Sequence, residues 1–148
     1  MRYAGTTPGA ETKLSEMRSF EAHPASLARI RMFVRELAER GEVPPEVTSD
    51  LLLAVSEACA NAVLHSGSPR IEVEWLQQFG RVHIGVRDEG VFLPEDERKD
   101  RAPTARLGLY LMQATVDRVL VEPGTPHRPG TVVWLEKSLH NDLVPESA

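Results

Sequence analysis

Cysteine is nearly missing from this sequence, with Cys59 as the only example among 148 residues. No disulfide can therefore form within one chain. Cys59 lies on the apolar side of a predicted helix, which favours a small buried side chain over a reactive thiol. The five histidines do not pair at metal-ligand spacing, and the sequence holds no HExxH motif and no Cys/His cluster. These absences argue against zinc chemistry.

Positive charge and long apolar runs are also scarce. The net charge is -5 and the basic residues are scattered, which argues against non-specific binding to nucleic acid. No uninterrupted apolar run approaches the roughly 20 residues of a membrane helix, and the first 13 residues lack the apolar region of a signal peptide. We therefore expect a cytoplasmic protein that contacts neither a membrane nor nucleic acid directly.

Two further signatures are absent, namely the GxSxG nucleophile elbow and the GxxxxGK[ST] phosphate loop. The remaining composition is ordinary for a soluble globular protein, at 41% hydrophobic and 26% charged residues. A chain of this length suits one domain with a single buried core.

The most informative stretch runs from Asp50 to His65. On a helix of about 100° per residue, one side collects its apolar members, which are Leu51, Leu52, Val55, Cys59, Ala62 and Val63. The other side carries Asp50, Glu57, Asn61 and His65 beside the small residues Ala54 and Ala58. Small residues leave space, and a carboxylate next to a carboxamide can hold a hydrated cation and take a proton. This side is predicted to be one wall of a ligand site.

The other elements follow from period-two and helical spacing of apolar residues. They are a strand at 14–21, a helix at 25–40, strands at 70–79 and 81–87 around Gly80, a helix at 107–116, and strands at 117–122 and 131–137. Residues 91–106 mix proline with charges of both signs and show no period. Such a segment is either a functional lid or a plain surface loop.

This order of elements predicts an α/β fold of the α+β two-layer sandwich type. The helices would lie on one face of a mainly antiparallel, mixed sheet. Residues 14–138 would form the single domain, between flexible tails at 1–13 and 139–148.

Four short motifs resemble, in order and spacing, the nucleotide-binding boxes of the GHKL ATPases, which share the Bergerat ATP-binding fold. They are EACANAVLH from Glu57 to His65, VRDEG from Val86 to Gly90, LGLYL from Leu107 to Leu111, and GTV from Gly130 to Val132. The small size and the phrases SEACANAV and LGLYLM look most like the anti-sigma-factor serine kinases of this histidine-kinase-like superfamily. The resemblance covers roughly residues 14–137.

The resemblance implies a role for each residue that matches a motif. Asn61 would bind a Mg²⁺ ion that bridges the phosphates of ATP, since a neutral oxygen suits a hard cation that keeps several waters. Glu57 would be the general base that takes the proton from a substrate serine. Gly108 would open a helix N-terminus toward the phosphates, flanked in the same box by Leu107 and Leu109.

At the other end of the nucleotide, Asp88 would accept a hydrogen bond from the exocyclic amine of adenine. Gly90 would let the backbone approach the base, and Thr131 would support the same subsite through its hydroxyl. Two residues keep alternative interpretations. His65 is either a phosphate or substrate contact or a structural histidine at the helix end, and Arg106 either clamps the γ-phosphate or is solvated charge.

The implied function is an ATP- and Mg²⁺-dependent protein serine/threonine kinase that acts as an anti-sigma factor. It would phosphorylate an anti-anti-sigma partner of the STAS type and so switch the sequestration of a sigma factor. The resemblance also implies a homodimer. A gyrase-like ATPase subunit is a weaker alternative because no transducer domain is present, and a histidine kinase is weaker because no dimerisation helix precedes the motifs.

Two departures from the family pattern affect this interpretation. Phe92 stands where the family usually has a second glycine, and Ala105 and Arg106 stand where glycines usually precede the Leu-Gly pair. Both changes add bulk or stiffness to segments that wrap the nucleotide. They predict reduced activity, and they leave open a catalytically weak or inactive module that binds nucleotide or a partner and regulates transcription.

Overall fold

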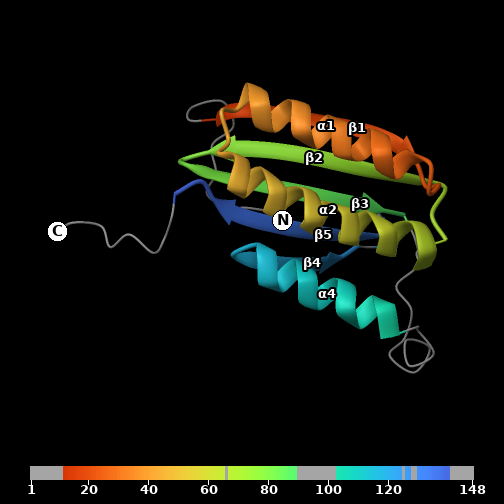
Figure 1. Cartoon of the computed structure of the whole chain (residues 1–148). Coiled ribbons are helices and arrows are strands. Elements are labelled where there is room, and N and C mark those ends of the chain that lie inside the picture. The colour runs from red at the N-terminus through yellow and green to blue at the C-terminus, as the bar shows by residue number, and fades with distance from the viewer. Residues whose placement is uncertain (1–11, 66, 90–102, 125, 128–129, 141–148) are drawn as a thin grey trace.

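The computed structural model describes residues 12–65, 67–89, 103–124, 126–127 and 130–140, and for residues 12, 65 and 103–106 it describes the backbone alone. The elements shown in Figure 1 are β1 (Thr12–Glu21), α1 (Ser26–Arg40), α2 (Pro45–His65), β2 (Arg70–Gln78), β3 (Arg81–Asp88), α4 (Pro103–Thr115), β4 (Arg118–Pro123) and β5 (Thr131–Ser138). The predicted elements are all found. α4 begins at Pro103 instead of the predicted Leu107.

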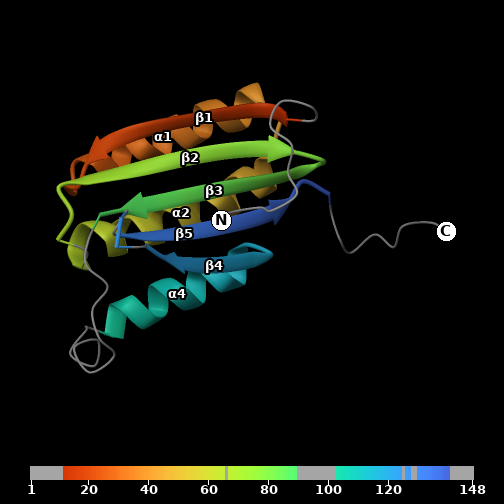
Figure 2. The same cartoon turned by 180° about the vertical axis from the view of Figure 1, so that it is seen from behind.

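The strands form one five-stranded sheet in the order β1-β2-β3-β5-β4. Figure 2 shows the sheet from behind, with β1 and β4 as its two edges. Every pair of neighbours among the described strands is antiparallel, so these strands lack the parallel part expected of a mixed sheet. Two of the four pairs, β2–β3 and β4–β5, join consecutive strands, and β5 pairs with β3 on its other side.

The turn between β2 and β3 consists of Phe79 and Gly80, which have φ angles of 51° and 71°. Positive φ at both central residues is the requirement of the two-residue turn whose twist matches that of antiparallel strands. Glycine adopts this conformation without steric cost, which fixes the hairpin register at its tight end. The hairpin predicted around Gly80 is therefore confirmed.

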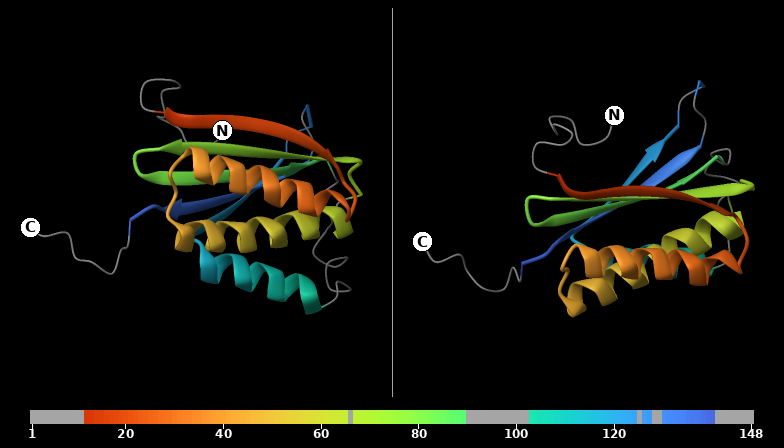
Figure 3. Two further views of the ribbon diagram at one scale, coloured as in Figure 1. Left: turned by 45° about the horizontal axis from the view of Figure 1, so that its top comes forward. Right: turned by 90° about the horizontal axis from the view of Figure 1, so that it is seen from above.

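The three helices of the described residues cover one face of the sheet, as Figure 3 shows from two directions. α1 contacts β1 and β2, and α2 contacts β2, β3 and β5. α4 lies beside α2 and reaches β4. This arrangement confirms the predicted two-layer α+β sandwich.

α2 is the central helix of the core. Leu51, Val55 and Cys59 are 0% exposed, as their predicted apolar side requires. Ala54 and Ala58 were expected to line open space on the polar side, but they are 0% and 2% exposed. That expectation was wrong, because both alanines belong to the buried hydrophobic core of the domain.

By length and composition alone, the stretch Pro45–Leu64 could also cross a membrane, with a mean hydropathy of 1.4. In the folded protein 44% of this stretch is buried, and the helix contacts three strands and both of the other described helices. Its apolar character is therefore accounted for by the core of the domain.

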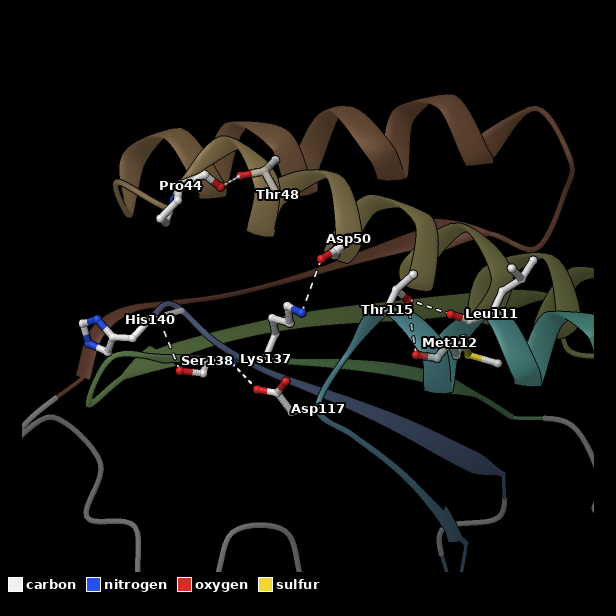
Figure 4. Close-up of polar contacts among 10 residues, drawn as sticks. All are labelled: Pro44, Thr48, Asp50, Leu111, Met112, Thr115, Asp117, Lys137, Ser138 and His140. Carbon is white, nitrogen blue, oxygen red and sulfur yellow. Dashed lines mark hydrogen bonds and ion pairs between the residues drawn. The ribbon is translucent and has the colours of Figure 1, made fainter. Parts of the chain in front are cut away.

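Polar contacts attach α2 and the corner between α4 and β4 to β5 (Figure 4). Lys137 Nζ on β5 lies 3.3 Å from Asp50 Oδ2 on α2. The Asp117 N–H donates to the Glu136 carbonyl at 2.9 Å, and Asp117 Oδ2 accepts a hydrogen bond from the Ser138 N–H at 2.7 Å. The ion pair joins α2 to the strand whose other end carries Thr131, and the Asp117 hydrogen bonds join the corner between α4 and β4 to the same strand.

Burial raises the pKa of the Cys59 thiol to about 12 from its ordinary 9.0. The thiolate is the reactive form, so a pKa raised by this amount lowers its fraction at mildly alkaline pH by roughly a thousandfold. We expect iodoacetamide to label Cys59 far more slowly in the folded protein than in concentrated guanidinium chloride, as measured by mass spectrometry. Equal labelling rates in the two conditions would contradict the burial of this face of α2.

Candidate active site

Four elements meet at one end of the sheet, on the face that the helices cover. β3 ends there at Asp88 and β5 begins there at Thr131. The C-terminal part of α2 and the N-terminal part of α4 lie at the same end, on the right in Figure 1 and on the left in Figure 2. The fold thus brings together four motifs that are far apart in the sequence.

Gly108 on α4 lies against the side of α2 that carries Glu57 and Asn61. A methyl group placed on Gly108 would lie 2.9 Å from Glu57 Oε2, 3.5 Å from Asn61 Nδ2 and 3.7 Å from Asn61 Oδ1. Gly108 is buried, whereas Glu57 and Asn61 are half-buried. The missing side chain of Gly108 therefore leaves room for the carboxylate and the amide between the two helices.

Glu57 and Asn61 lie one turn apart on the same side of α2, as residues at i and i+4 do. Because both side chains are only partly buried, their polar groups are accessible from solvent. A carboxylate in this position can accept a proton from a substrate held within hydrogen-bond reach. The amide oxygen of Asn61 can bind a hard cation.

Asp88 and Thr131 are direct partners in the register between β3 and β5. Ile84 and Val86 on β3, and Leu135 on β5, are buried in the core beneath the helices. Because side chains alternate along a strand, Asp88 and Thr131 share the face of these residues and project toward the helix layer. A carboxylate and a hydroxyl side by side can bind the polar edge of a planar group.

Two residues that the sequence interpretation did not assign hold the backbone beside Asp88. Ser68 Oγ accepts a hydrogen bond from the Glu89 N–H at 3.0 Å. Gly130 has a φ of 124°, and a methyl group there would overlap the Asp88 carbonyl oxygen. The GTV motif was an available signal for Gly130. Ser68 stands in the stretch SGSP, which indicates only a turn.

For the other predicted site residues the structure shows little of how their side chains relate to the site. Leu107 and Leu109 flank Gly108 on α4 and are 55% and 42% exposed, so their place in the nucleotide site stays a prediction. For His65 and Arg106 the structure describes the backbone alone, and Gly90 lies outside the described residues.

The sequence predicted that Gly108 lies at a helix N-terminus, but the structure places it inside the helix. α4 begins at Pro103, a residue favoured in the first helical turn, so Gly108 lies in the second turn. The predicted position of Gly108 at the start of the helix was therefore wrong, whereas its role toward the phosphates stays a prediction. Residues 103–106, expected in the irregular segment, are helical, whereas 90–102 lie outside the described residues.

Within the described part of the chain, no three His, Cys, Asp or Glu side chains form a group that could hold a metal ion. Magnesium needs fewer protein ligands than that, because it keeps several waters and is commonly completed by substrate phosphates. Asn61, beside the space that Gly108 leaves, fits this requirement.

Comparison with known proteins decides the family. A family model described as the histidine kinase-like ATPase domain matches residues 20–137, which include every residue assigned to the site. The chain belongs to this family. The resemblance given by the four motifs is thereby confirmed.

Three relatives, named as serine-protein kinases or as an anti-sigma factor, match over most of both chains. The serine-protein kinase RsbW of Bacillus subtilis is 30% identical over 139 residues, which are 83% of this chain and 84% of the relative. RsbW of Bacillus pumilus is 33% identical over 141 residues, covering 83% and 85%. The anti-sigma F factor of Geobacillus stearothermophilus is 27% identical over 131 residues, covering 80% and 88%. The predicted class, an anti-sigma serine kinase, is confirmed.

Solved structures agree on the fold. The crystal structure of the RsbU and RsbW domains of a Mycobacterium tuberculosis protein matches with a TM-score of 0.65 at 20% identity, over 84% of this chain and 32% of that longer chain. The histidine kinase domain of a blue-light activated kinase from Erythrobacter litoralis matches with a TM-score of 0.52 at 25% identity, over 78% and 60%.

We expect Gly108→Ala to lower kinase activity by about tenfold or more without lowering the melting temperature. The new methyl group would displace the Glu57 carboxylate, since the two would be 2.9 Å apart. The helix itself would gain stability, because alanine is favoured over glycine by about 1 kcal/mol within a helix. Thermal unfolding and phosphorylation assays measure the two effects separately.

Gln113→Ala is the matched control, because it also places alanine on α4 but at an exposed position. It should leave activity unchanged. Wild-type activity in Gly108→Ala would show that the contact between α4 and Glu57 has no part in the reaction.

Proposed function

We propose that the chain is an ATP- and Mg²⁺-dependent protein serine/threonine kinase that sequesters a sigma factor and phosphorylates an anti-anti-sigma protein of the STAS type. Phosphorylation of that partner would switch the sequestration of the sigma factor. Family membership and the relatives named serine-protein kinase and anti-sigma F factor support this proposal.

One observation supports the catalytic assignment above the others, namely the position of Glu57 and Asn61 at the contact with Gly108. A proton acceptor and a cation ligand are presented together, partly exposed, at the sheet end where Asp88 and Thr131 pair. A merely solvated helix face would not need a glycine on the neighbouring helix to accommodate it.

ATP binding is the common property of this family of ATPase domains. In our proposal the Asp88 carboxylate accepts a hydrogen bond from the adenine amine, and Thr131 supports the same subsite with its hydroxyl. Asn61 holds the Mg²⁺ ion by its amide oxygen. When bound, Mg²⁺ neutralises charge on the phosphate oxygens during transfer. Gly90 keeps the role that the resemblance implies for it. His65 and Arg106 keep the two alternatives given for each from the sequence.

The chemical step then belongs to Glu57. Its carboxylate accepts the proton of the substrate serine while the serine oxygen forms a bond to the γ-phosphorus and the bond from that phosphorus to ADP breaks. Phosphoryl transfer depends mainly on positioning and charge stabilisation, so the close packing at Gly108 contributes by limiting the positions open to Glu57. The phosphate adds about -1.5 to -2 charges to the partner and so changes its interface.

We infer that the protein works in the cytoplasm as a homodimer, without contacts to a membrane or to nucleic acid. The net charge of -5 supports the inference that the protein does not bind nucleic acid, because such binding relies on clustered basic residues. The protein partners, a sigma factor and an anti-anti-sigma protein, are supported by the names of the relatives.

We expect Glu57→Gln to lower the rate of phosphorylation of a candidate anti-anti-sigma protein by about 10²-fold or more, the range of general-base catalysis. ATP affinity should stay close to that of the wild type, because the amide keeps the size of the side chain. Labelled ATP with Mg²⁺ measures the first quantity, and calorimetry measures the second.

Glu46→Gln is the matched control, since Glu46 is exposed in the first turn of the same helix and loses the same charge. It should retain full activity. Equal activity of the Glu57→Gln variant and the wild type would remove Glu57 from the mechanism.

We also expect Asn61→Ala to weaken ATP binding about tenfold in the presence of Mg²⁺ and hardly at all in the presence of EDTA. The reason is that Asn61 would act through the ion and not on the nucleotide. An equal loss in both conditions would contradict its role as a metal ligand. If the wild type itself shows no ATP binding at millimolar concentration, the protein acts as a partner-binding module without chemistry.

A further inference from the structure

The peptide bond between Asp88 and Glu89 is held from both sides. On the side of β2, its N–H donates to Ser68 Oγ at 3.0 Å. On the side of β5, its carbonyl faces Gly130, where a methyl group would overlap the Asp88 oxygen and lie 3.0 Å from the Glu89 Cα. β3 lies between these two strands, so the two contacts act on opposite edges of one peptide unit.

Ser68 acts just where the regular ladder stops. The last pairs of β3 join Asp88 to Ile71 on β2 and to Thr131 on β5. The next amide, that of Glu89, is bound by the serine side chain. Ser68 is only 8% exposed, and its hydroxyl also donates to the Arg70 carbonyl at 2.6 Å. Both roles of the hydroxyl, donor and acceptor, are therefore directed at backbone groups in a buried position.

We propose that Ser68 is a positioning residue of the nucleotide site, which fixes the Asp88–Glu89 peptide and thereby the direction of the Asp88 carboxylate toward the adenine base. The inference rests on the proposed function, because it assumes that Asp88 binds adenine. Ser68 does not touch the nucleotide in this proposal. It acts through the backbone of the residue that does.

The expected consequence concerns base selectivity more than overall binding. A carboxylate held in one direction distinguishes the amine of adenine from the carbonyl at the same place in guanine. Without the hydrogen bond from Glu89 to Ser68, the peptide can rotate, since Gly130 limits only its carbonyl side. ATP affinity should then fall while the weak affinity for GTP changes little.

The test compares ATP and GTP affinities of the wild type, Ser68→Ala and Ser68→Thr by calorimetry with Mg²⁺. We expect Ser68→Ala to lower the preference for ATP over GTP by about fivefold or more, and Ser68→Thr, which keeps the hydroxyl, to restore most of it. Ser138→Ala is the matched control. It removes a serine hydroxyl that likewise accepts from a backbone N–H, that of His140 at 3.2 Å, at the opposite end of β5.

A double-mutant cycle with Asp88→Asn tests the proposed route. If Ser68 acts through Asp88, the loss of selectivity caused by Ser68→Ala disappears in the Asp88→Asn background, because coupled residues are not additive. Ser68→Cys, which keeps the size of the side chain but accepts hydrogen bonds poorly, serves the same comparison if the alanine variant does not fold.

The outcomes separate this inference from the function on which it rests. A wild type that binds ATP, together with Ser68 variants that lose thermal stability but keep full selectivity, overturns the positioning role alone. A wild type that does not bind ATP overturns the nucleotide site and this inference with it. Additive losses in the double-mutant cycle show that Ser68 does not act through Asp88.

Discussion

The close approach of α4 to α2 at Gly108 is the contact on which the candidate site depends. Glu57 and Asn61 come from one helix, and only the neighbouring helix gives their side chains a defined space. Ala54 and Ala58, on the same helix, are both buried in the core. The glycine on α4 therefore leaves room between the two helices for the polar side chains of Glu57 and Asn61.

The second half of the site depends on strand register. Asp88 and Thr131 share a face of the sheet because they are partners in the β3–β5 ladder. A slip of one residue would turn either strand's side chains to the opposite face. Lys137, at the other end of β5, contacts Asp50 on α2 at 3.3 Å. β5 thus carries Thr131 of the site, and through Lys137 it contacts α2, the helix that carries Glu57 and Asn61.

Local sequence patterns predicted the helices and strands well, but they predicted the contacts between these elements less well. The apolar spacing of α2 and the alternation of β2 and β3 are properties of neighbouring residues, so both could be read directly. Ala54 and Ala58 were misplaced because alanine suits an open pocket wall and a buried core position equally. The first turn of α4 was missed because Pro103–Arg106 carries no apolar period. Ser68 was missed because its partner, Glu89, is near only in the folded chain.

The sequence by itself determined the order of helices and strands, the buried side of α2 and the four motifs that identify the family, because each of these depends on short-range spacing. The tertiary structure alone decided that Gly108 packs against Glu57 and Asn61, that Asp88 faces the helices beside Thr131, and that Ser68 and Gly130 hold the peptide beside Asp88. These contacts join residues that are distant along the chain. Their geometry is set by the packing of α4 on α2 and by the register of β3 with β5, and neither is encoded in any single segment.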